Sequence, residues 1–208
     1  VMNRLGIIVF ISAFTVFGVM PAMATEEAKY SVVKKDEAFE LRDYASHIVA
    51  ETLVAGDIND ASSKAFSKLF GYISGKNKSR SKVAMTAPVS QTPAAEKIAM
   101  TAPVGQQSVG NKWAVSFMMP ASYTMQTLPK PDDPSVILRE VPARRVASIR
   151  YSGLWSEARY REHKLQLEAW ILKNKMKASG EANWARYDPP FKPWFLRRNE
   201  ILIPVETN

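Results

Sequence analysis

The chain has no cysteine and only two histidines among its 208 residues. Without cysteine it cannot form disulfides, thiolate nucleophiles, zinc–thiolate sites or haem–thioether links. The sequence also lacks a Gly-x-Ser-x-Gly elbow, a His-Glu-x-x-His motif and a glycine-rich phosphate loop. These absences favour a protein that is not an enzyme. A hydrolase assembled from dispersed Ser, His and Asp residues stays a weaker alternative.

Acidic residues are outnumbered by basic ones, 20 Asp and Glu against 28 Lys and Arg, which gives a net charge of +8. A basic surface attracts anionic partners such as acidic lipids, nucleic acid or carboxylate-bearing small molecules. The basic residues form no long run, and this argues against nucleic acid. The composition therefore favours an anionic small molecule without naming one.

Long apolar runs are confined to the first residues of the sequence. Arg4 precedes an almost wholly apolar segment, 5–20, and Ala22-Met23-Ala24 has the small-x-small pattern of a cleavage site. This order predicts a signal peptide over residues 1–24 and a protein that is exported, periplasmic or secreted. A membrane anchor is the alternative, but the apolar segment is shorter than the roughly 20 residues that a span needs. We expect no stable membrane span after cleavage.

Alternating apolar residues predict strands over 30–35, 39–42, 48–54 and 112–119. A helix is expected over 61–74, after the turn at 56–60, and a second over 156–176 with Ser156 as its N-cap. Prolines make 120–134 an extended loop, and those at 189, 190 and 193 keep the block 184–203 out of a helix and out of a central ladder before it ends in a strand. The second of these segments is also aromatic and basic, and we expect it to present Phe191, Lys192 and Trp194 at the surface.

The two halves of the chain repeat one plan. Residues 40–56 align without gaps on 137–153 at a constant offset, with identical residues at Leu41/Leu138, Arg42/Arg139, Val49/Val146, Ala50/Ala147 and Gly56/Gly153. A helix is expected after each copy. The repeat predicts a duplicated, pseudo-two-fold α+β domain over 25–208, with halves at about 30–119 and 120–205.

An eight-residue phrase also occurs twice. Lys82-Val-Ala-Met-Thr-Ala-Pro-Val89 returns as Lys97-Ile-Ala-Met-Thr-Ala-Pro-Val104. The phrase is typical of a strand end followed by a proline exit, and we interpret it as packing of the sheet. The second copy is interpreted as a local insertion that forms a hairpin with the first across 91–95. Met85 and Met100 as iron ligands are the alternative.

Together these segments resemble the SOUL haem-binding proteins. The resemblance rests on the repeated phrase, the Arg42-Asp43-Tyr44 strand, the helix end at 72–77 and the run Tyr187-Asp-Pro-Pro-Phe-Lys-Pro193 with Arg197-Arg-Asn-Glu-Ile201. It extends over essentially all of 30–205. The family implies a distorted antiparallel β-barrel flanked by two α-helices, and reversible binding of a tetrapyrrole in a surface groove without turnover.

The resemblance also implies a site for haem, or for iron-free porphyrin. Its residues are Ser63, Phe66, Ser67 and Phe70 on the first helix, and Lys192 in the aromatic loop. The phenylalanines would contact the porphyrin face, and Lys192 would hold a propionate. Two positions that are basic in the family are Ser63 and Gly71 in this chain, so propionate recognition differs here.

The two histidines are the candidates for an axial iron ligand. His47 follows the first repeated strand, and His163 lies on the second expected helix. Each fits a solvated or core histidine better than a ligand, so we expect weak or absent ligation.

We therefore expect a monomer that carries or buffers a tetrapyrrole and binds no nucleic acid. The alternatives are an exported carrier of a lipid or another hydrophobic metabolite, and an envelope module that acts through protein contacts.

Overall fold

The computed structural model describes residues 25–80 and 95–206. The predicted signal peptide and the first copy of the repeated phrase lie outside the described residues. None of the helices within these ranges is long and apolar enough to cross a bilayer.

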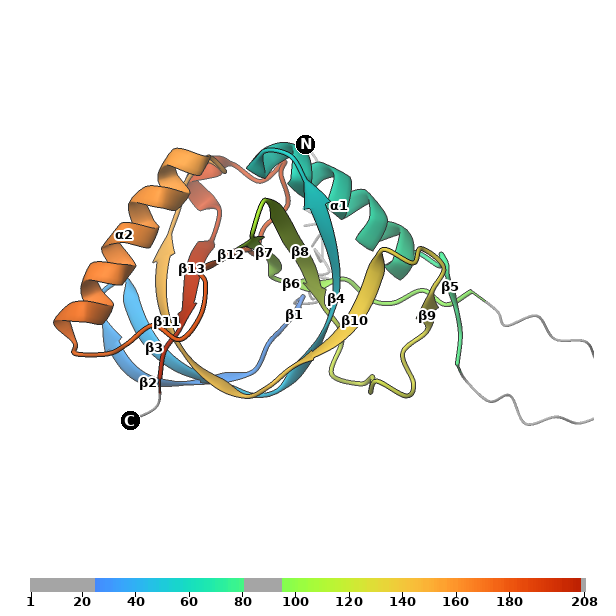
Figure 1. Ribbon diagram of the computed structural model, residues 1–208, viewed down its shortest axis with the longest axis horizontal. Coiled ribbons are helices and arrows are strands. Elements are labelled where there is room, and N and C mark those ends of the chain that lie inside the picture. Colours follow the sequence, from blue (N-terminus) through green and yellow to red (C-terminus); the bar gives the residue numbers. More distant parts are fainter. Residues whose placement is uncertain (1–24, 81–94, 207–208) are drawn as a thin grey trace, which may run out of the picture.

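One large antiparallel sheet forms the body of the protein and curls into a half-barrel (Figure 1). Its nine strands follow the order β10-β4-β8-β7-β12-β13-β11-β3-β2. The strands of the first half are β2 (Tyr30–Asp36), β3 (Phe39–Tyr44), β4 (His47–Ala55), β7 (Val104–Val109) and β8 (Lys112–Met118). Those of the second half are β10 (Val136–Val141), β11 (Arg144–Tyr151), β12 (Asn183–Arg186) and β13 (Asn199–Pro204).

Without the edge strand β2, the sheet order is symmetric between the two halves. Strands β3, β4, β7 and β8 take the places that β10, β11, β12 and β13 take from the opposite edge. The limits of β3 and β10 differ by the same offset as the sequence repeat. The two halves exchange strands β3 and β10: β10 of the second half pairs with β4, and β3 of the first half pairs with β11. The predicted α+β, pseudo-two-fold fold is confirmed, and the expected distorted antiparallel barrel flanked by two helices takes the form of a half-barrel. The expectation that the block from residue 184 stays out of a central ladder is wrong at its start, because β12 ends before the prolines and pairs with β7 and β13.

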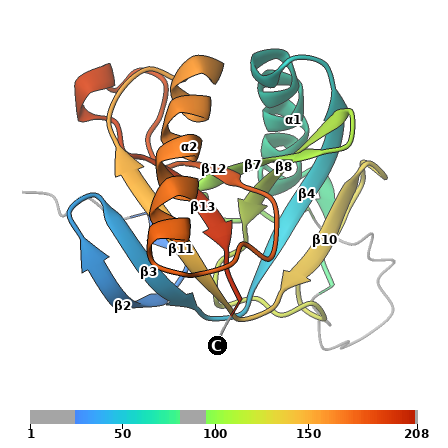
Figure 2. The same cartoon turned by 60° about the vertical axis from the view of Figure 1, so that its left-hand side comes forward.

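The two helices lie outside the curve of the sheet (Figure 1). Helix α1 (Ile58–Ile73) packs on β4 and β8, and α2 (Glu157–Lys173) packs on β11 and β13. In Figure 2 the strands β7, β8, β12 and β13 are seen between them. Ser156 caps α2, as predicted, by accepting a hydrogen bond from the backbone N–H of Arg159. Both helices follow a glycine with positive φ, Gly56 at 127° and Gly153 at 135°, a conformation that favours glycine.

Each helix covers its own apolar core. Under α1, the buried side chains include Leu69, Tyr72, Val115 and Phe117. Under α2 they include Leu167, Trp170, Trp184 and Ile201. Because alternate residues of a strand point to opposite faces, β4 and β8 direct one set of side chains to α1 and the other into the curl of the sheet.

The second copy of the repeated phrase links the first half of the sheet to the N-terminal segment. Ile98 is buried in the core under α1, and Thr101–Ala102 forms the short strand β6. This strand pairs in parallel with β1 (Glu26–Glu27), which lies inside the curled sheet (Figure 1). A second two-stranded sheet joins β5 (Asn77–Lys78) to β9 (Lys130–Pro131). The predicted hairpin across 91–95 depends on the first copy, outside the described residues.

Candidate functional site

The outer face of α1 carries four of the residues expected to bind haem. Phe66 and Phe70 stack on each other with ring centroids 5.8 Å apart and are 39% and 48% exposed. Phe66 also meets the buried ring of Phe117 edge-on at 5.3 Å. Ser63 and Ser67 are exposed on the same face, where the Ser67 hydroxyl donates to the Ser63 carbonyl at 3.2 Å. The helix therefore presents an aromatic surface that is anchored in the core and open to solvent.

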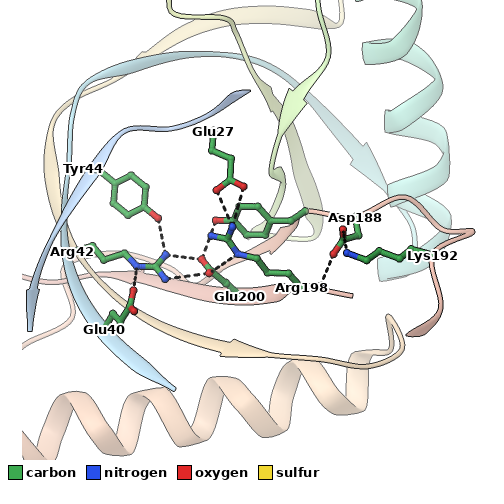
Figure 3. Close-up of polar contacts among 9 residues, drawn as sticks. Glu27, Glu40, Arg42, Tyr44, Asp188, Lys192, Arg198 and Glu200 are labelled. Atoms are coloured by element: carbon green, nitrogen blue, oxygen red, sulfur yellow. Dashed lines mark hydrogen bonds and ion pairs between the residues drawn. The ribbon is translucent and has the colours of Figure 1, made fainter. Parts of the chain in front are cut away.

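Lys192 lies in the aromatic loop between β12 and β13. Its ammonium donates to the Asp188 carboxylate at 2.6 Å, and the other Asp188 oxygen accepts the Arg198 backbone N–H at 2.5 Å (Figure 3). Burial would raise the pKa of Asp188, but the hydrogen bonds from Arg198 and Lys192 outweigh it and lower that pKa. The loop contains the short 3₁₀ helix η1 (Trp194–Leu196) and exposes Phe191 and Trp194, as predicted.

Arg186, at the end of β12, connects this loop to α1. Its Nη1 donates to Ser62 Oγ at 2.8 Å, its Nη2 donates to Gln106 Oε1, and its guanidinium lies 4.2 Å from the Trp184 ring centroid. Burial lowers the pKa of Arg186 to about 10, and its Nε has no hydrogen-bond partner. This buried cation, beside the first turns of α1, was not identified from the sequence. Its neighbours Trp184 and Tyr187 mark the aromatic segment in the sequence but gave no reason to single out this arginine.

The two histidines lie away from the phenylalanine pair. His163 is buried on α2, stacks on Tyr151 at 3.8 Å, and its Nδ1 is 2.7 Å from the Arg159 carbonyl oxygen. His47, on β4, lines the inside of the curled sheet, whereas α1 packs on the outside. The structure therefore brings Ser63, Phe66, Ser67 and Phe70 together on one helix face, with neither histidine among them.

A cavity of about 420 Å³ occupies the concave face of the sheet. Its wall is built from the inward-facing residues of eight strands, β3, β4, β7, β8, β10, β11, β12 and β13, together with the N-terminal Glu27 and Ala28. The described residues of this lining include His47 but none of Ser63, Phe66, Ser67, Phe70 or Lys192. We refer to this space as the concave cavity.

A buried charge network forms the floor beside the concave cavity. Glu200, which is fully buried, accepts hydrogen bonds from Arg42, Arg198 and Tyr187 (Figure 3). Burial would raise the pKa of Glu200, but the hydrogen bonds and positive charges of Arg42 and Arg198 lower it. Arg198 also binds both Glu27 carboxylate oxygens, at 3.0 and 2.9 Å. The network thus ties β1, β3 and β13 together.

The His47 ring is held by the turn before β4. Its Nδ1 is 3.1 Å from the Ala45 carbonyl oxygen, which can only accept, so that nitrogen carries the proton in the neutral ring and Nε2 is the acceptor. Burial lowers the pKa of His47 despite this hydrogen bond, and nearby Arg144 and Arg139 lower it further. Within the described ranges, no group of three or more His, Cys, Asp or Glu residues is arranged to hold a metal ion.

The same fold occurs in solved structures of different proteins. The C-terminal domain of EcmrR matches with a TM-score of 0.58 at 11% identity, covering 86% of this chain and 99% of that domain. A hydrolase from Listeria innocua matches with a TM-score of 0.54 at 12% identity, covering 84% and 94%. At these identities the likeness concerns the fold alone.

Sequence relatives are more specific. Heme-binding protein 1 of Mus musculus is 30% identical over 147 residues, 70% of this chain and 72% of the relative. Heme-binding protein 1 of Xenopus tropicalis is 27% identical over 171 residues, 81% and 84% of the two chains. The model of the SOUL heme-binding protein family matches residues 25–204. The chain therefore belongs to the SOUL haem-binding protein family.

Proposed function

We propose that this protein binds haem or another tetrapyrrole on the outer face of α1, without catalysis, and carries or buffers it. The observation that supports the proposal most is the stacked pair Phe66–Phe70, because its rings stay exposed although Phe66 is anchored on Phe117. Clustered exposed aromatic rings indicate an interaction surface more often than chance exposure does. Family membership supports a tetrapyrrole as the ligand.

The apolar contact supplies most of the affinity in this proposal. Removing about 300 Å² of apolar surface from water stabilises a complex by several kcal/mol, at about 25 cal/mol per Å². Part of this gain offsets the translational and rotational freedom lost on association. Ser63 and Ser67 have short side chains, so a flat ring can approach the helix beside the two phenylalanines.

Lys192 is proposed to pair with a propionate of the ligand. The ammonium is bound to Asp188 in the structure, so it has to exchange one carboxylate for another. Asp188 keeps the Arg198 N–H after such an exchange, which lowers the cost of releasing Lys192. Arg186 adds a buried positive charge beside Ser62 that favours an anionic group near the first turns of α1.

Haem supplies an iron centre when bound, but the residues proposed here hold the porphyrin by its face and its carboxylates. His47 lines the concave cavity and His163 is buried on α2, so both lie away from the outer face of α1. We therefore propose that neither is an axial ligand, and that iron-free porphyrin binds about as well as haem. The protein is further proposed to act as a monomer after export, with residues 1–24 removed.

A haem titration tests this proposal, with the Soret band and tryptophan fluorescence followed together. Phe66→Asp puts a charge against the porphyrin face, and Leu165→Asp places the same charge on an exposed apolar position of α2 as a matched control. We expect one-to-one saturation in the wild type and in the control, and loss of saturation with Phe66→Asp. Equal haem affinity of the two variants would show that haem does not bind on the outer face of α1.

A carrier role for a different small molecule has its own structural support. The concave cavity shares no lining residue with α1 and is large enough for a small ligand.

A further inference from the structure

The concave cavity contains a positive charge that the fold leaves uncompensated. Arg144, the first residue of β11, lines the cavity, and no residue within 25–80 or 95–206 forms a hydrogen bond or ion pair with its guanidinium. The other charged side chains of the lining are paired. Arg139 Nη2 binds Glu51 at 2.7 Å, and Glu27 binds Arg198 at 2.9 Å. Arg144 therefore remains as the charge that a ligand can neutralise.

The surroundings of Arg144 favour an anion. The residue is exposed to solvent on one side, but desolvation of its guanidinium by the cavity wall lowers its pKa, and the positive charge of Arg139 lowers that pKa further. A carboxylate between the two guanidiniums would relieve both effects, because its charge is opposite and its two oxygens fit the planar N–H fork of arginine. A doubly charged phosphate would find only one uncompensated positive charge here, so a carboxylate fits better.

The rest of the cavity wall suits an apolar body with few polar atoms. The inward-facing apolar side chains that line it are Val49, Pro103, Val109, Ala114, Met118, Val141, Val146, Leu202 and Pro204. Asn183 also lines the wall, and its buried Oδ1 accepts no hydrogen bond from any residue that the structure describes. A volume of about 420 Å³ lies within the range of small-molecule sites. The cavity thus combines a positively charged end, an apolar wall and one buried acceptor, Asn183 Oδ1, that a ligand could satisfy.

The position of this charge follows from the pseudo-two-fold symmetry. Arg144 is the symmetry equivalent of His47, and Val146 is the equivalent of Val49. All four residues line the cavity, so the two halves contribute the same strand positions to one wall. The symmetry is broken where a neutral imidazole on one side faces a guanidinium on the other, and this gives the cavity one charged end.

We propose that the concave cavity is a second binding site, which takes a small organic carboxylate with an apolar body. The carboxylate accepts hydrogen bonds from Arg144 and from the free N–H groups of Arg139, and the apolar body lies against Val49, Val146, Met118 and Leu202. This site shares no residue with the tetrapyrrole surface of α1, so it goes beyond the proposed function and does not depend on it.

Isothermal titration calorimetry with decanoate tests the site, with decan-1-ol as the uncharged analogue. Arg144→Gln removes the charge, and the fold should be retained because Arg144 has no bonded partner in the described residues. Arg150→Gln, on the same strand but outside the lining, is the matched control. We expect one-to-one binding of decanoate that Arg144→Gln weakens about tenfold, since a charged hydrogen bond contributes about 1.5–3 kcal/mol. Arg150→Gln should bind like the wild type, and decan-1-ol should bind weakly and equally to all three proteins.

Methionine methyl NMR locates the ligand within the same protein. Met118 lines the concave cavity, whereas Met119, the next residue, packs in the core under α1. Decanoate should shift the Met118 methyl signal and leave that of Met119 in place. A shift at Met119 alone, absence of saturable binding, or equal affinity of Arg144→Gln and Arg150→Gln would overturn the proposal.

The haem experiments separate the two sites. Arg144→Gln should leave the haem titration unchanged, and Phe66→Asp should leave decanoate affinity unchanged. Haem that displaces decanoate stoichiometrically would mean one shared site and would contradict a second one.

Discussion

Arg42 and Glu200, 158 residues apart in the chain, form a two-point ion pair inside the half-barrel, with Nη1–Oε2 at 2.6 Å and Nη2–Oε1 at 3.1 Å. Arg42 comes from β3 and Glu200 from β13, and β11 lies between these strands. The pair therefore spans a strand and joins the two exchanged halves of the sheet.

Breaking this pair should destabilise the protein strongly. Arg42→Met leaves the buried Glu200 with Arg198 and Tyr187 as partners, and we expect a loss of about 3 kcal/mol in the free energy of unfolding, at the low end for a broken buried pair. The double variant Arg42→Met, Glu200→Leu should recover part of that loss, because no charge is left unpaired at either position. Urea denaturation measures both. A double variant less stable than the single one would contradict this explanation.

The same carboxylate should make the protein sensitive to acid. The pKa of Glu200 is lowered in the folded protein, so the folded state binds fewer protons than the unfolded state as the pH falls below the ordinary value of 4.5. The stability that Glu200 contributes is complete above that pH and is lost as the pH falls through the lowered pKa. Free energies of unfolding at several pH values between about 6 and 3 should show the loss. Its slope should be smaller in the Arg42→Met, Glu200→Leu variant, and equal slopes would exclude Glu200 as a cause.

Lys192→Glu should weaken haem more than a haem whose propionates are esterified. The substitution replaces an attraction to a carboxylate by a repulsion, and an ester carries no charge to repel. Because Lys192 is partly exposed, we expect a loss on the order of fivefold in affinity. Parallel Soret titrations with haem and its dimethyl ester measure the difference. Equal losses for both ligands would show that Lys192 acts through the loop and not through a propionate.

Removing the histidines should leave the tetrapyrrole site intact. His47→Asn and His163→Asn are expected to keep the wild-type haem affinity and Soret position, because neither ring lies on the outer face of α1. Protoporphyrin IX should bind all three proteins with similar affinity. A changed Soret band in one variant would identify that histidine as an iron ligand and would contradict the proposed geometry.

Local features of the fold could be predicted from the sequence because they depend on neighbours in the chain. The N-cap of α2 at Ser156 and the buried stripe of α1 formed by Ala65, Leu69 and Tyr72 both follow from helical spacing. The duplication could be detected for a different reason: residues 40–56 and 137–153 align at a constant offset, and this alignment is found by comparing the sequence with itself. The offset places β3 on β10 and Arg144 on His47, but it says nothing of which surface these residues share.

The residues of the candidate sites also fall into those that the sequence indicates and those that only the structure reveals. Phe66 and Phe70 were named because the resemblance to the family points to these positions, and their spacing of four residues places both on one helix face. Arg186 was missed, because its partners Ser62 and Gln106 come from α1 and β7, and its buried position depends on how these elements pack.

The sequence by itself determined the family, the duplicated α+β plan and the aromatic face of α1. Each of these depends on residues that are adjacent in the chain or that recur at a regular spacing. Only the tertiary structure decided that β3 and β10 cross to the opposite halves and that Glu200 is buried among Arg42, Arg198 and Tyr187. It also decided that Arg144 lines a cavity and has no bonded partner among the described residues. Such features bring together residues far apart in the chain, as Arg42 and Glu200 are at 158 positions. The free energy of such contacts depends on burial and on the distance between charges, and both quantities exist only when the sheet has curled.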